Sequence, residues 1–261
     1  MLVRIRLGVW ISGIVSSMNN NKVFRFLRAL LSLRKKSSWG PFVEAFETTK
    51  FDHSFSVSWS QAAEDLAILA VLDYFEGGRY LDIGAHHPTR FSVTRHLFQR
   101  GWNGVNVDAN ADLIPNFLSA RPQDVSINFC VGDEREYQLS VFDETAISTV
   151  NPEWDSRFVQ ENNVRNSLRS VPGITLQEIL ETYFPTKGPD FMNVDIEGAD
   201  LEALRSGKLN LLAKNLRPTW ILVESGAPLA NAVQNESVQL LVSWDYEIYL
   251  VLPFACLLKS N

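Results

Sequence analysis

The sequence predicts an α/β fold, a mainly parallel β-sheet with helices on both faces. Short apolar runs alternate with helical patterns from Ser60 onward, and polar residues suited to ligand binding follow the ends of those runs. Strands covered on both faces read as near-continuous apolar runs, and their alternation with helices indicates parallel order. Such sheets bind ligands at the carboxyl ends of their strands, where the strand order reverses.

The composition fits one intracellular domain with an extension. The chain has 261 residues, of which 46% are hydrophobic, so a sizeable core can be buried. Its two cysteines, Cys130 and Cys256, provide neither a disulfide framework nor a CxxC metal motif. A reducing, cytoplasmic location is therefore expected, with both thiols buried as small hydrophobes.

Charge divides the chain into a basic extension, residues 1–43, and a domain, residues 44–261. The extension holds eight basic residues and no acidic one, whereas the domain holds 16 basic and 30 acidic residues. An acidic domain argues against nucleic-acid partners, because a phosphate backbone is held by clustered Lys and Arg. Within the extension, Lys22–Lys36 is basic and amphipathic at helical spacing. It either makes a peripheral contact with an anionic membrane or packs on the domain with its basic face solvated.

The first predicted helix and strand follow Ser60. Ser60 is an N-cap candidate, and Glu64 and Asp65 complement the helix dipole in the first turns. Gly77-Gly78 ends this helix. The apolar run Tyr80–Gly84 is then the first strand.

The middle of the domain continues the alternation. Thr94–Gln99 and Leu113–Ser119 are predicted helices, and Val105–Asp108 and Ile127–Val131 are predicted strands. Residues 135–172 are polar and irregular, and a long loop of this kind inside a compact domain is usually functional or mobile.

The last part of the domain returns to regular elements. Helices are predicted at Thr175–Tyr183, Asp200–Leu204 and Val233–Trp244. Strands are predicted at Phe191–Ile196, Trp220–Glu224, Glu247–Leu252 and Phe254–Leu258, the last two as a closing antiparallel pair.

Three strand ends together favour nucleoside binding. The first strand runs through Asp82 into Gly84 and Ala85, and a glycine there lets the backbone approach a ligand closely. This turn is not GxGxxG, so a dinucleotide pyrophosphate lacks its usual cradle. Asp108 ends the second strand, where a carboxylate accepts ribose hydroxyls, and Asp133 after the third strand suits an adenine amino group. Each acid alone is equally compatible with an ordinary turn.

A second group of residues favours chemistry at the reversal point. Asp195 ends the fourth strand, Glu224 ends the fifth, and His86 and His87 follow the first. The group suits either a histidine general base oriented by a carboxylate or a divalent cation held by carboxylates. The alternative is structural, with solvated turn histidines and acids that bind backbone amides.

These residues together resemble the FkbM family of methyltransferases from about Ser60 to Glu224. The family pattern commonly has Asn in place of His86, which favours His87 of the two histidines. The resemblance rests on the following residues: Ser60-Gln61, Glu64-Asp65, Tyr80–Ala85, His87-Pro88, Ser92, Thr94, Arg100–Trp102, Asn106–Asn110, Arg121-Pro122, Ser148-Thr149, Thr175-Leu176, Asp190-Phe191 and Asp195–Gly198.

The resemblance implies a Rossmann-like class I methyltransferase fold of seven strands, the last antiparallel to the rest. It implies S-adenosylmethionine as methyl donor and a hydroxyl of a sugar, glycan or secondary metabolite as acceptor. Asp195, His87 and Glu224 are then the expected catalytic residues, with the histidine preferred to a divalent cation. An oxidoreductase using NAD or a nucleotide sugar, and a non-catalytic membrane-associated adaptor, are the alternatives. The expected cosubstrate residues are Asp82, Gly84, Ala85, Asp108, Ala109 and Asp133.

Overall fold

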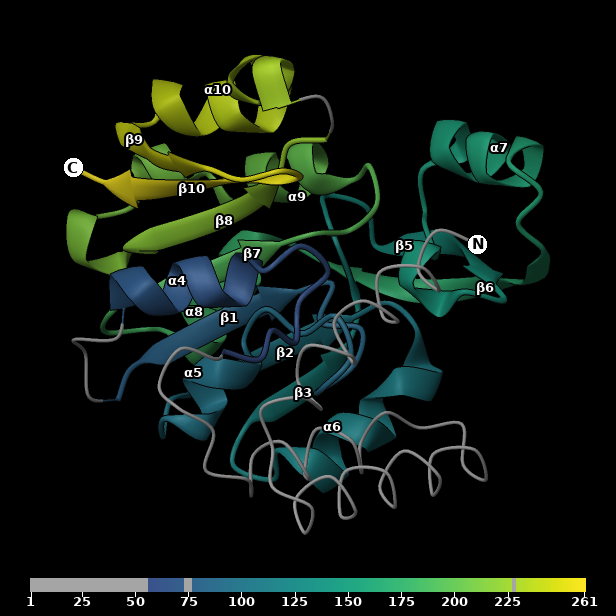
Figure 1. The fold of residues 1–261 in the computed structure, drawn as a ribbon, viewed down its shortest axis with the longest axis horizontal. Coiled ribbons are helices and arrows are strands. Elements are labelled where there is room, and N and C mark those ends of the chain that lie inside the picture. The colour runs from purple at the N-terminus through teal and green to yellow at the C-terminus, as the bar shows by residue number, and fades with distance from the viewer. Residues whose placement is uncertain (1–55, 73–76, 227–228) are drawn as a thin grey trace, which may run out of the picture. The chain divides into compact units, whose positions relative to one another are not determined.

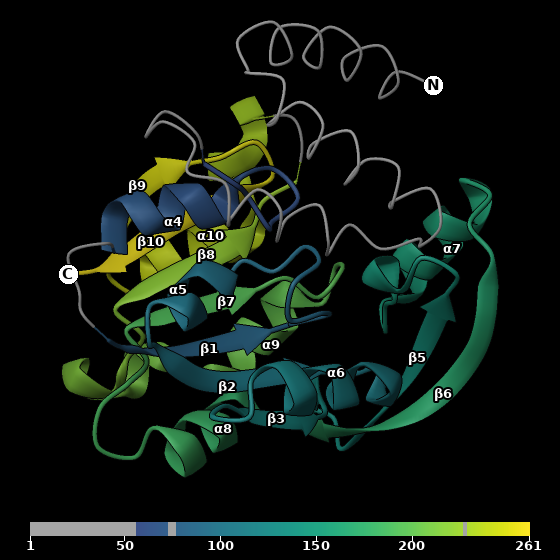
Figure 2. The ribbon, with the colours of Figure 1, turned by 60° about the horizontal axis from the view of Figure 1, so that its bottom comes forward.

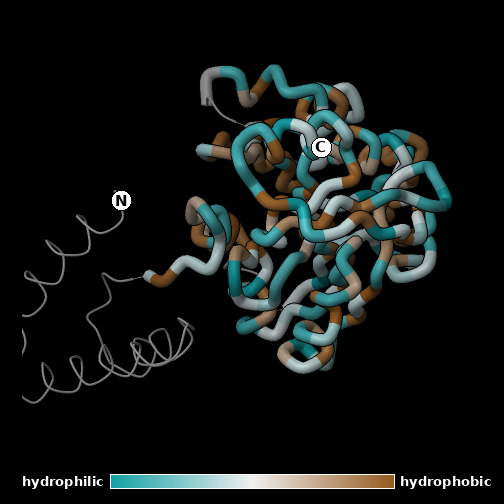
Figure 3. Tube along the Cα trace, turned by 90° about the vertical axis from the view of Figure 1, so that its right-hand side faces the viewer, coloured by the Kyte–Doolittle hydropathy of each residue, from teal (hydrophilic) through white to brown (hydrophobic). Residues whose placement is uncertain are grey.

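The computed structural model describes residues 56–72, 77–226 and 229–261. Ser58–Asn261 form one compact unit. The basic extension and its predicted boundary at residue 44 lie outside the described residues. Within the described residues, no helix combines the length and the apolar character that a membrane span requires. Figure 3 shows apolar residues in short stretches between hydrophilic ones along this part of the chain.

The main sheet has seven strands in the order β3-β2-β1-β7-β8-β10-β9 (Figure 1). All neighbours are parallel except β10, which runs antiparallel to both β8 and β9. The order reverses between β1 and β7, where Asp82 pairs with Asn193. The predicted fold class is therefore confirmed. The strands are β1 (Arg79–Ile83), β2 (Asn103–Asp108), β3 (Val125–Asn128), β7 (Phe191–Val194), β8 (Trp220–Glu224), β9 (Tyr246–Val251) and β10 (Ala255–Ser260).

Helices cover both faces of this sheet (Figure 2). On one face α4 and α5 share a hydrophobic core with Tyr80 and Leu222, and on the other α8, α9 and α10 share a core with Leu81 and Ile83. Successive residues of a strand point to opposite faces, so β1 supplies both cores. The helices are α4 (Glu64–Leu72), α5 (Arg95–Gln99), α6 (Ile114–Ala120), α8 (Leu176–Tyr183), α9 (Asp200–Gly207) and α10 (Glu236–Ser243).

The structure corrects the prediction of an irregular segment at residues 135–172. This segment forms β5 (Glu136–Phe142), α7 (Pro152–Gln160) and most of β6 (Arg165–Ile174). β5 and β6 pair as an antiparallel hairpin, which stands beyond the carboxyl ends of the main strands (Figure 1). One face of the hairpin buries Leu139, Val141 and Val171, and on the opposite face Glu136, Gln138, Leu168 and Ser170 are exposed while Phe142 is buried. Polar and charged residues in β5 and β6 interrupt the apolar alternation, so the sequence pattern did not predict these strands.

The predicted strand Ile127–Val131 is also corrected. It divides into β3 of the main sheet and β4 (Cys130–Val131), which pairs with β6 in a second sheet of order β4-β6-β5. The predicted strand therefore passes from one sheet to the other at Phe129. The predicted helix Val233–Trp244 likewise divides, because Asn235 caps α10 after a 3₁₀ segment, Leu229–Gln234.

Candidate active site

Two adjoining clefts open at the carboxyl ends of the central strands. The first cleft has an empty volume of about 540 Å³ and lies between the ends of β1, β2 and β4 and the segment 145–150. The second cleft has an empty volume of about 1080 Å³ and lies between the starts of α4 and α7 and the ends of β7 and β8. Asp195 and Glu197 line both clefts, so these two residues mark the junction.

Gly84 brings the loops after β1 and β7 together at the first cleft. Its φ is +78°, and a Cβ at this position would lie 1.7 Å from the carbonyl oxygen of Asp195. Only glycine fits such an approach, and its left-handed backbone carries no strain there. Ala85 is buried next to it and is not among the residues that line either cleft.

Asp108 presents its carboxylate to the first cleft at the end of β2. Its two oxygens accept hydrogen bonds from the backbone N–H groups of His86 and Asn110, each at 2.8 Å. Burial raises the pKa of Asp108 to about 6, against the lowering effect of these two hydrogen bonds. A carboxylate oxygen accepts more than one hydrogen bond, so both oxygens retain capacity for ligand hydroxyls. Ala109 lines the same cleft.

Asp82 lies in a buried polar network rather than at a cleft. Its carboxylate accepts hydrogen bonds from Thr94 Oγ1 (2.6 Å) and Asn193 Nδ2 (3.0 Å). Arg121, fully buried, donates to Thr94 Oγ1 at 2.8 Å and to the carbonyl oxygen of Pro88 at 2.7 Å. We infer that the negative charge of Asp82 offsets the positive charge of the buried guanidinium, and that this network fixes the loop after β1.

Asp133 does not reach the first cleft. It follows β4 rather than a strand of the main sheet, and it is exposed. The wall of the first cleft at this point consists of Phe129, Cys130 and Val131. The difference arises because the predicted third strand is divided into β3 and β4. Asp133 therefore lies two residues after the end of β4, away from the main sheet.

The two histidines occupy different positions. His86 lines the first cleft, shares a hydrogen bond of 3.0 Å with Thr145 Oγ1, and has a left-handed backbone with φ of +50°. Burial and the charge of Arg90 lower the pKa of His86 to about 4, so its imidazole is neutral at pH 7. His87 lines neither cleft, and its Nδ1 accepts a hydrogen bond from the N–H of Thr89 at 3.1 Å. Sequence reasoning preferred His87, whereas the structure brings His86 to the cleft.

The second cleft is acidic and partly aromatic. It contains the carboxyl groups of Asp195, Glu197 and Glu224 together with that of Glu64 and the guanidinium of Arg157. Aromatic and polar side chains complete its wall, as expected of a site for a ligand with both apolar and hydroxyl-bearing faces. They are Gln61, Phe91, Trp154, Phe158, Asn193 and Phe254.

The acidic groups at the junction raise one another's pKa. Burial raises the pKa of Glu197 to about 8, with contributions from the charges of Asp195 and Asp200, while Arg157 opposes the shift. Burial and neighbouring acids also raise the pKa of Asp195 and of Glu224. The Asp195 side chain is open to solvent within the clefts, so water screens part of its shift. A raised pKa makes such a carboxyl group a stronger proton acceptor, as a general base requires.

The hairpin segment holds the loop after β7 in place. Thr149 Oγ1 donates to the carbonyl oxygen of Glu197, and Asn151 Nδ2 donates to that of Gly198, both at 2.8 Å. Glu197 has φ of +51°, which is rare for a residue with a side chain. Trp154 packs on Gly198, where a Cβ would lie 2.5 Å from the indole nitrogen. Sequence reasoning quoted Glu197 only as part of a motif, and it missed Trp154 and Arg157.

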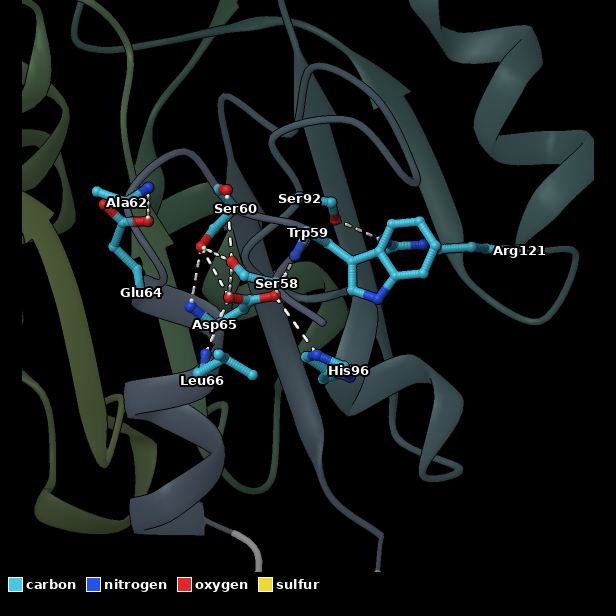
Figure 4. A network of polar contacts seen from close by, with 10 residues as sticks. All are labelled: Ser58, Trp59, Ser60, Ala62, Glu64, Asp65, Leu66, Ser92, His96 and Arg121. Atoms are coloured by element: carbon cyan, nitrogen blue, oxygen red, sulfur yellow. Dashed lines mark hydrogen bonds and ion pairs between the residues drawn. The ribbon is translucent and has the colours of Figure 1, made fainter. Parts of the chain in front are cut away.

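The start of α4 forms another wall of the second cleft. Figure 4 shows the polar contacts that hold this start in place. Asp65, 1% exposed, accepts hydrogen bonds from Ser58 Oγ (2.7 Å) and from the N–H of Trp59 (2.6 Å). The N–H of Asp65 donates to Ser60 Oγ at 3.2 Å, but α4 begins only at Glu64, so Ser60 lies before the N-cap position that the sequence predicted for it. Glu64 is thereby fixed at the cleft, where it accepts from a backbone N–H in the preceding turn.

Within the described ranges, no three His, Cys, Asp or Glu side chains are grouped so that they could hold a metal ion.

Comparisons with known proteins give one family. The model of the family "Methyltransferase FkbM domain" matches residues 82–248. No curated protein sequence matches the chain significantly. Among solved structures, the chain is similar to a TehB-like SAM-dependent methyltransferase from Corynebacterium glutamicum, with 11% identity, a TM-score of 0.39, and coverage of 76% of this chain and 87% of that one. It is also similar to Aeropyrum pernix fibrillarin in complex with natively bound S-adenosyl-L-methionine, with 14% identity, a TM-score of 0.38, and coverage of 75% and 74%.

Proposed function

Because the chain belongs to the FkbM methyltransferase family, we propose that it transfers a methyl group from S-adenosylmethionine to a hydroxyl of a sugar, glycan or secondary metabolite. The observation that supports this proposal best is the pair of clefts that meet at Asp195 and Glu197. Two substrates that react directly need adjoining sites with their reacting atoms at the junction. The family assignment replaces the oxidoreductase alternative.

The first cleft fits the cosubstrate by its polar groups. It combines a close-approach glycine, Gly84, with the carboxylate of Asp108 and with three buried polar atoms that have no hydrogen-bond partner among the described residues. These atoms are His86 Nδ1, Asn110 Nδ2 and Ser148 Oγ. Unpaired buried polar atoms are costly unless a ligand or water satisfies them. Asp108 would hold the ribose hydroxyls, with Ala109 beside the base.

The second cleft would hold the acceptor. When bound, S-adenosylmethionine supplies a methyl group already activated on a sulfonium, so the protein has to orient the acceptor hydroxyl and remove its proton. Carboxylates accept hydroxyl hydrogen bonds, and aromatic side chains pack on apolar faces of a ligand. Trp154 and Phe158 from α7 would provide the apolar contact, in the cleft that Glu64 and Glu224 also line.

We propose Asp195 as the proton acceptor. It lines both clefts at the end of β7, and burial together with neighbouring acids raises its pKa from the usual range. Glu197 and Glu224 would share the released proton. His87, the base expected from the sequence, is tied to its own turn through Nδ1, which favours the carboxylate. A divalent cation remains the second candidate for activating the hydroxyl.

A methyl-transfer screen tests the function. The protein is incubated with isotopically labelled S-adenosylmethionine and a panel of glycans and hydroxylated metabolites, and products are identified by mass spectrometry. We expect label on an acceptor oxygen, and no loss of rate with a chelator if Asp195 acts alone. Methyl transfer to nitrogen or sulfur only would overturn the proposal. Transfer to no acceptor, while the protein still binds the cosubstrate, would also overturn it and would favour the non-catalytic adaptor.

A further inference from the structure

A short stretch of chain between β5 and α7 borders both clefts. Ser148 and Val150 line the first cleft, and Trp154 of α7 lines the second. The side chains of Thr149 and Asn151, which alternate with these residues, instead contact the loop after β7. The same stretch therefore adjoins both proposed binding sites and the loop that carries the residues common to them.

Thr149 is fixed before its hydroxyl reaches that loop. The residue is 1% exposed, and its backbone exchanges two hydrogen bonds with Ser140 of β5, at 2.9 and 3.1 Å. The hydroxyl donates to the carbonyl oxygen of Glu197 and accepts from the N–H of Asn151 at 2.9 Å. Because both functions of the hydroxyl are engaged, it has one orientation, and it joins β5 to the carbonyl group of Glu197.

Asn151 makes a second connection through its amide group. Its Oδ1 caps α7 by accepting a hydrogen bond from the N–H of Glu153 at 2.9 Å. Its Nδ2 donates to the carbonyl oxygen of Gly198. The start of α7, which brings Trp154 and Phe158 to the second cleft, is therefore tied to the same loop.

The backbone of this loop needs such contacts. Glu197 and Gly198 have φ of +51° and +90°, and the left-handed region is unfavourable for a residue with a side chain. A conformation of this kind persists where the surrounding structure holds it in place. At the start of the loop, the N–H of Asp195 donates to the last carbonyl group of β1 at 3.1 Å. The loop is thus held by β1 before its two acids and by Thr149 and Asn151 after them.

We propose that Thr149 and Asn151 are positioning residues for methyl transfer, because the two carbonyl groups they hold keep the carboxyl group of Asp195 at the junction of the clefts. This inference rests on the proposed function, since the position of Asp195 matters to the rate only if the two bound substrates react there. A displacement of about 1 Å can lower a rate about 100-fold, so two hydrogen bonds to the backbone are sufficient to matter.

Kinetics of paired variants test the proposal on an acceptor found by the screen. Thr149→Val keeps the shape of the side chain and the backbone pairing with Ser140 but loses the hydroxyl, whereas Thr149→Ser keeps the hydroxyl. We expect kcat of Thr149→Val to fall about 10-fold to 100-fold, with most of the rate retained in Thr149→Ser. The Kd for S-adenosylhomocysteine should stay near that of the wild type. Thr175→Val is the matched control, because it loses the cap of α8 and lines neither cleft.

Titration of the Glu197 carboxyl carbon by NMR gives a readout that needs no acceptor. Burial and the charges of Asp195 and Asp200, opposed by Arg157, set the pKa of Glu197 at about 8. If the loop is released in Thr149→Val, the carboxyl group should become more hydrated and its pKa should fall towards the usual range. Thr149→Ser should titrate like the wild type.

Asn151→Ser keeps an oxygen that caps α7 but removes the NH₂ donor, so it should behave like Thr149→Val and replaces that variant if it does not fold. Unchanged kcat and unchanged titration in the variant used would overturn the proposal, as would equal losses of kcat in Thr149→Val and Thr149→Ser. A wild type that transfers no methyl group would instead refute the proposed function, and the NMR titration would then decide whether these residues hold the loop.

Discussion

Replacing Asp108 by Asn tests the cosubstrate site. In the folded protein the Asp108 carboxylate has a backbone N–H on each oxygen and faces the first cleft. Asn keeps the size of the side chain but loses the charge, and its NH₂ group cannot accept from the ribose. A hydrogen bond to a charged group contributes about 1.5–3 kcal/mol, so we expect the Kd for S-adenosylhomocysteine to rise about 10-fold to 150-fold.

The assay is calorimetric titration of wild type, Asp108→Asn and Asp133→Asn. The third protein is a matched control, since Asp133 is exposed and is not among the residues lining the first cleft. One backbone N–H would face the new NH₂ group in Asp108→Asn, so unfolding temperatures are measured alongside. Unchanged affinity in a folded Asp108→Asn, or a larger loss in Asp133→Asn, would refute the assignment of ribose binding.

Three further predictions concern stability, pH and the basic extension. Arg121→Met should destabilise the fold by about 3–5 kcal/mol in denaturant unfolding, because Asp82 would lose the nearby buried positive charge and the Pro88 carbonyl would lose its buried donor. A loss under about 1 kcal/mol would contradict the network. The pKa of Glu197 is raised in the folded state, so its contribution to stability is present below its usual pKa and is lost as pH rises towards about 8. The unfolding temperature of Glu197→Gln should therefore fall less steeply than that of the wild type as pH rises over that range. Identical pH profiles for the two proteins would count against a raised pKa of Glu197. The full chain should sediment with anionic vesicles in low salt, and acidic replacements within Lys22–Lys36 should abolish this; unaltered sedimentation would exclude the electrostatic contact.

The sequence predicted the fold because its main strands are short apolar runs with clear ends. Gly84 and Asp108 follow directly from such ends, and both line the first cleft. Asp195 and Glu224 were likewise placed together by the parallel pairing of β7 and β8, and both line the second cleft. At these positions the local sequence pattern and the strand order are sufficient to predict which residues line the clefts.

Other positions depend on contacts that the local sequence does not encode. The run Ile127–Val131 changes sheet because β6, about forty residues later, pairs with its second half. The choice between His86 and His87 depends on one left-handed residue at His86, which turns the first imidazole towards Thr145. Trp154 and Arg157 lie in α7, between β5 and β6. These two strands depend on their pairing with each other and have no clear local sequence pattern.

Turnover by Asp195→Asn is the most direct test of the claim that the two clefts meet at a proton-accepting carboxylate. On an acceptor found by the screen, labelled methyl transfer by the variant should fall by at least about 100-fold, the usual contribution of a general base. The Kd for S-adenosylhomocysteine should remain near that of the wild type, because Asp108 and Gly84, the proposed cosubstrate residues, are unchanged. The wild-type rate should rise with pH as the raised pKa of Asp195 is passed. Full activity of Asp195→Asn with unchanged pH dependence would contradict the account.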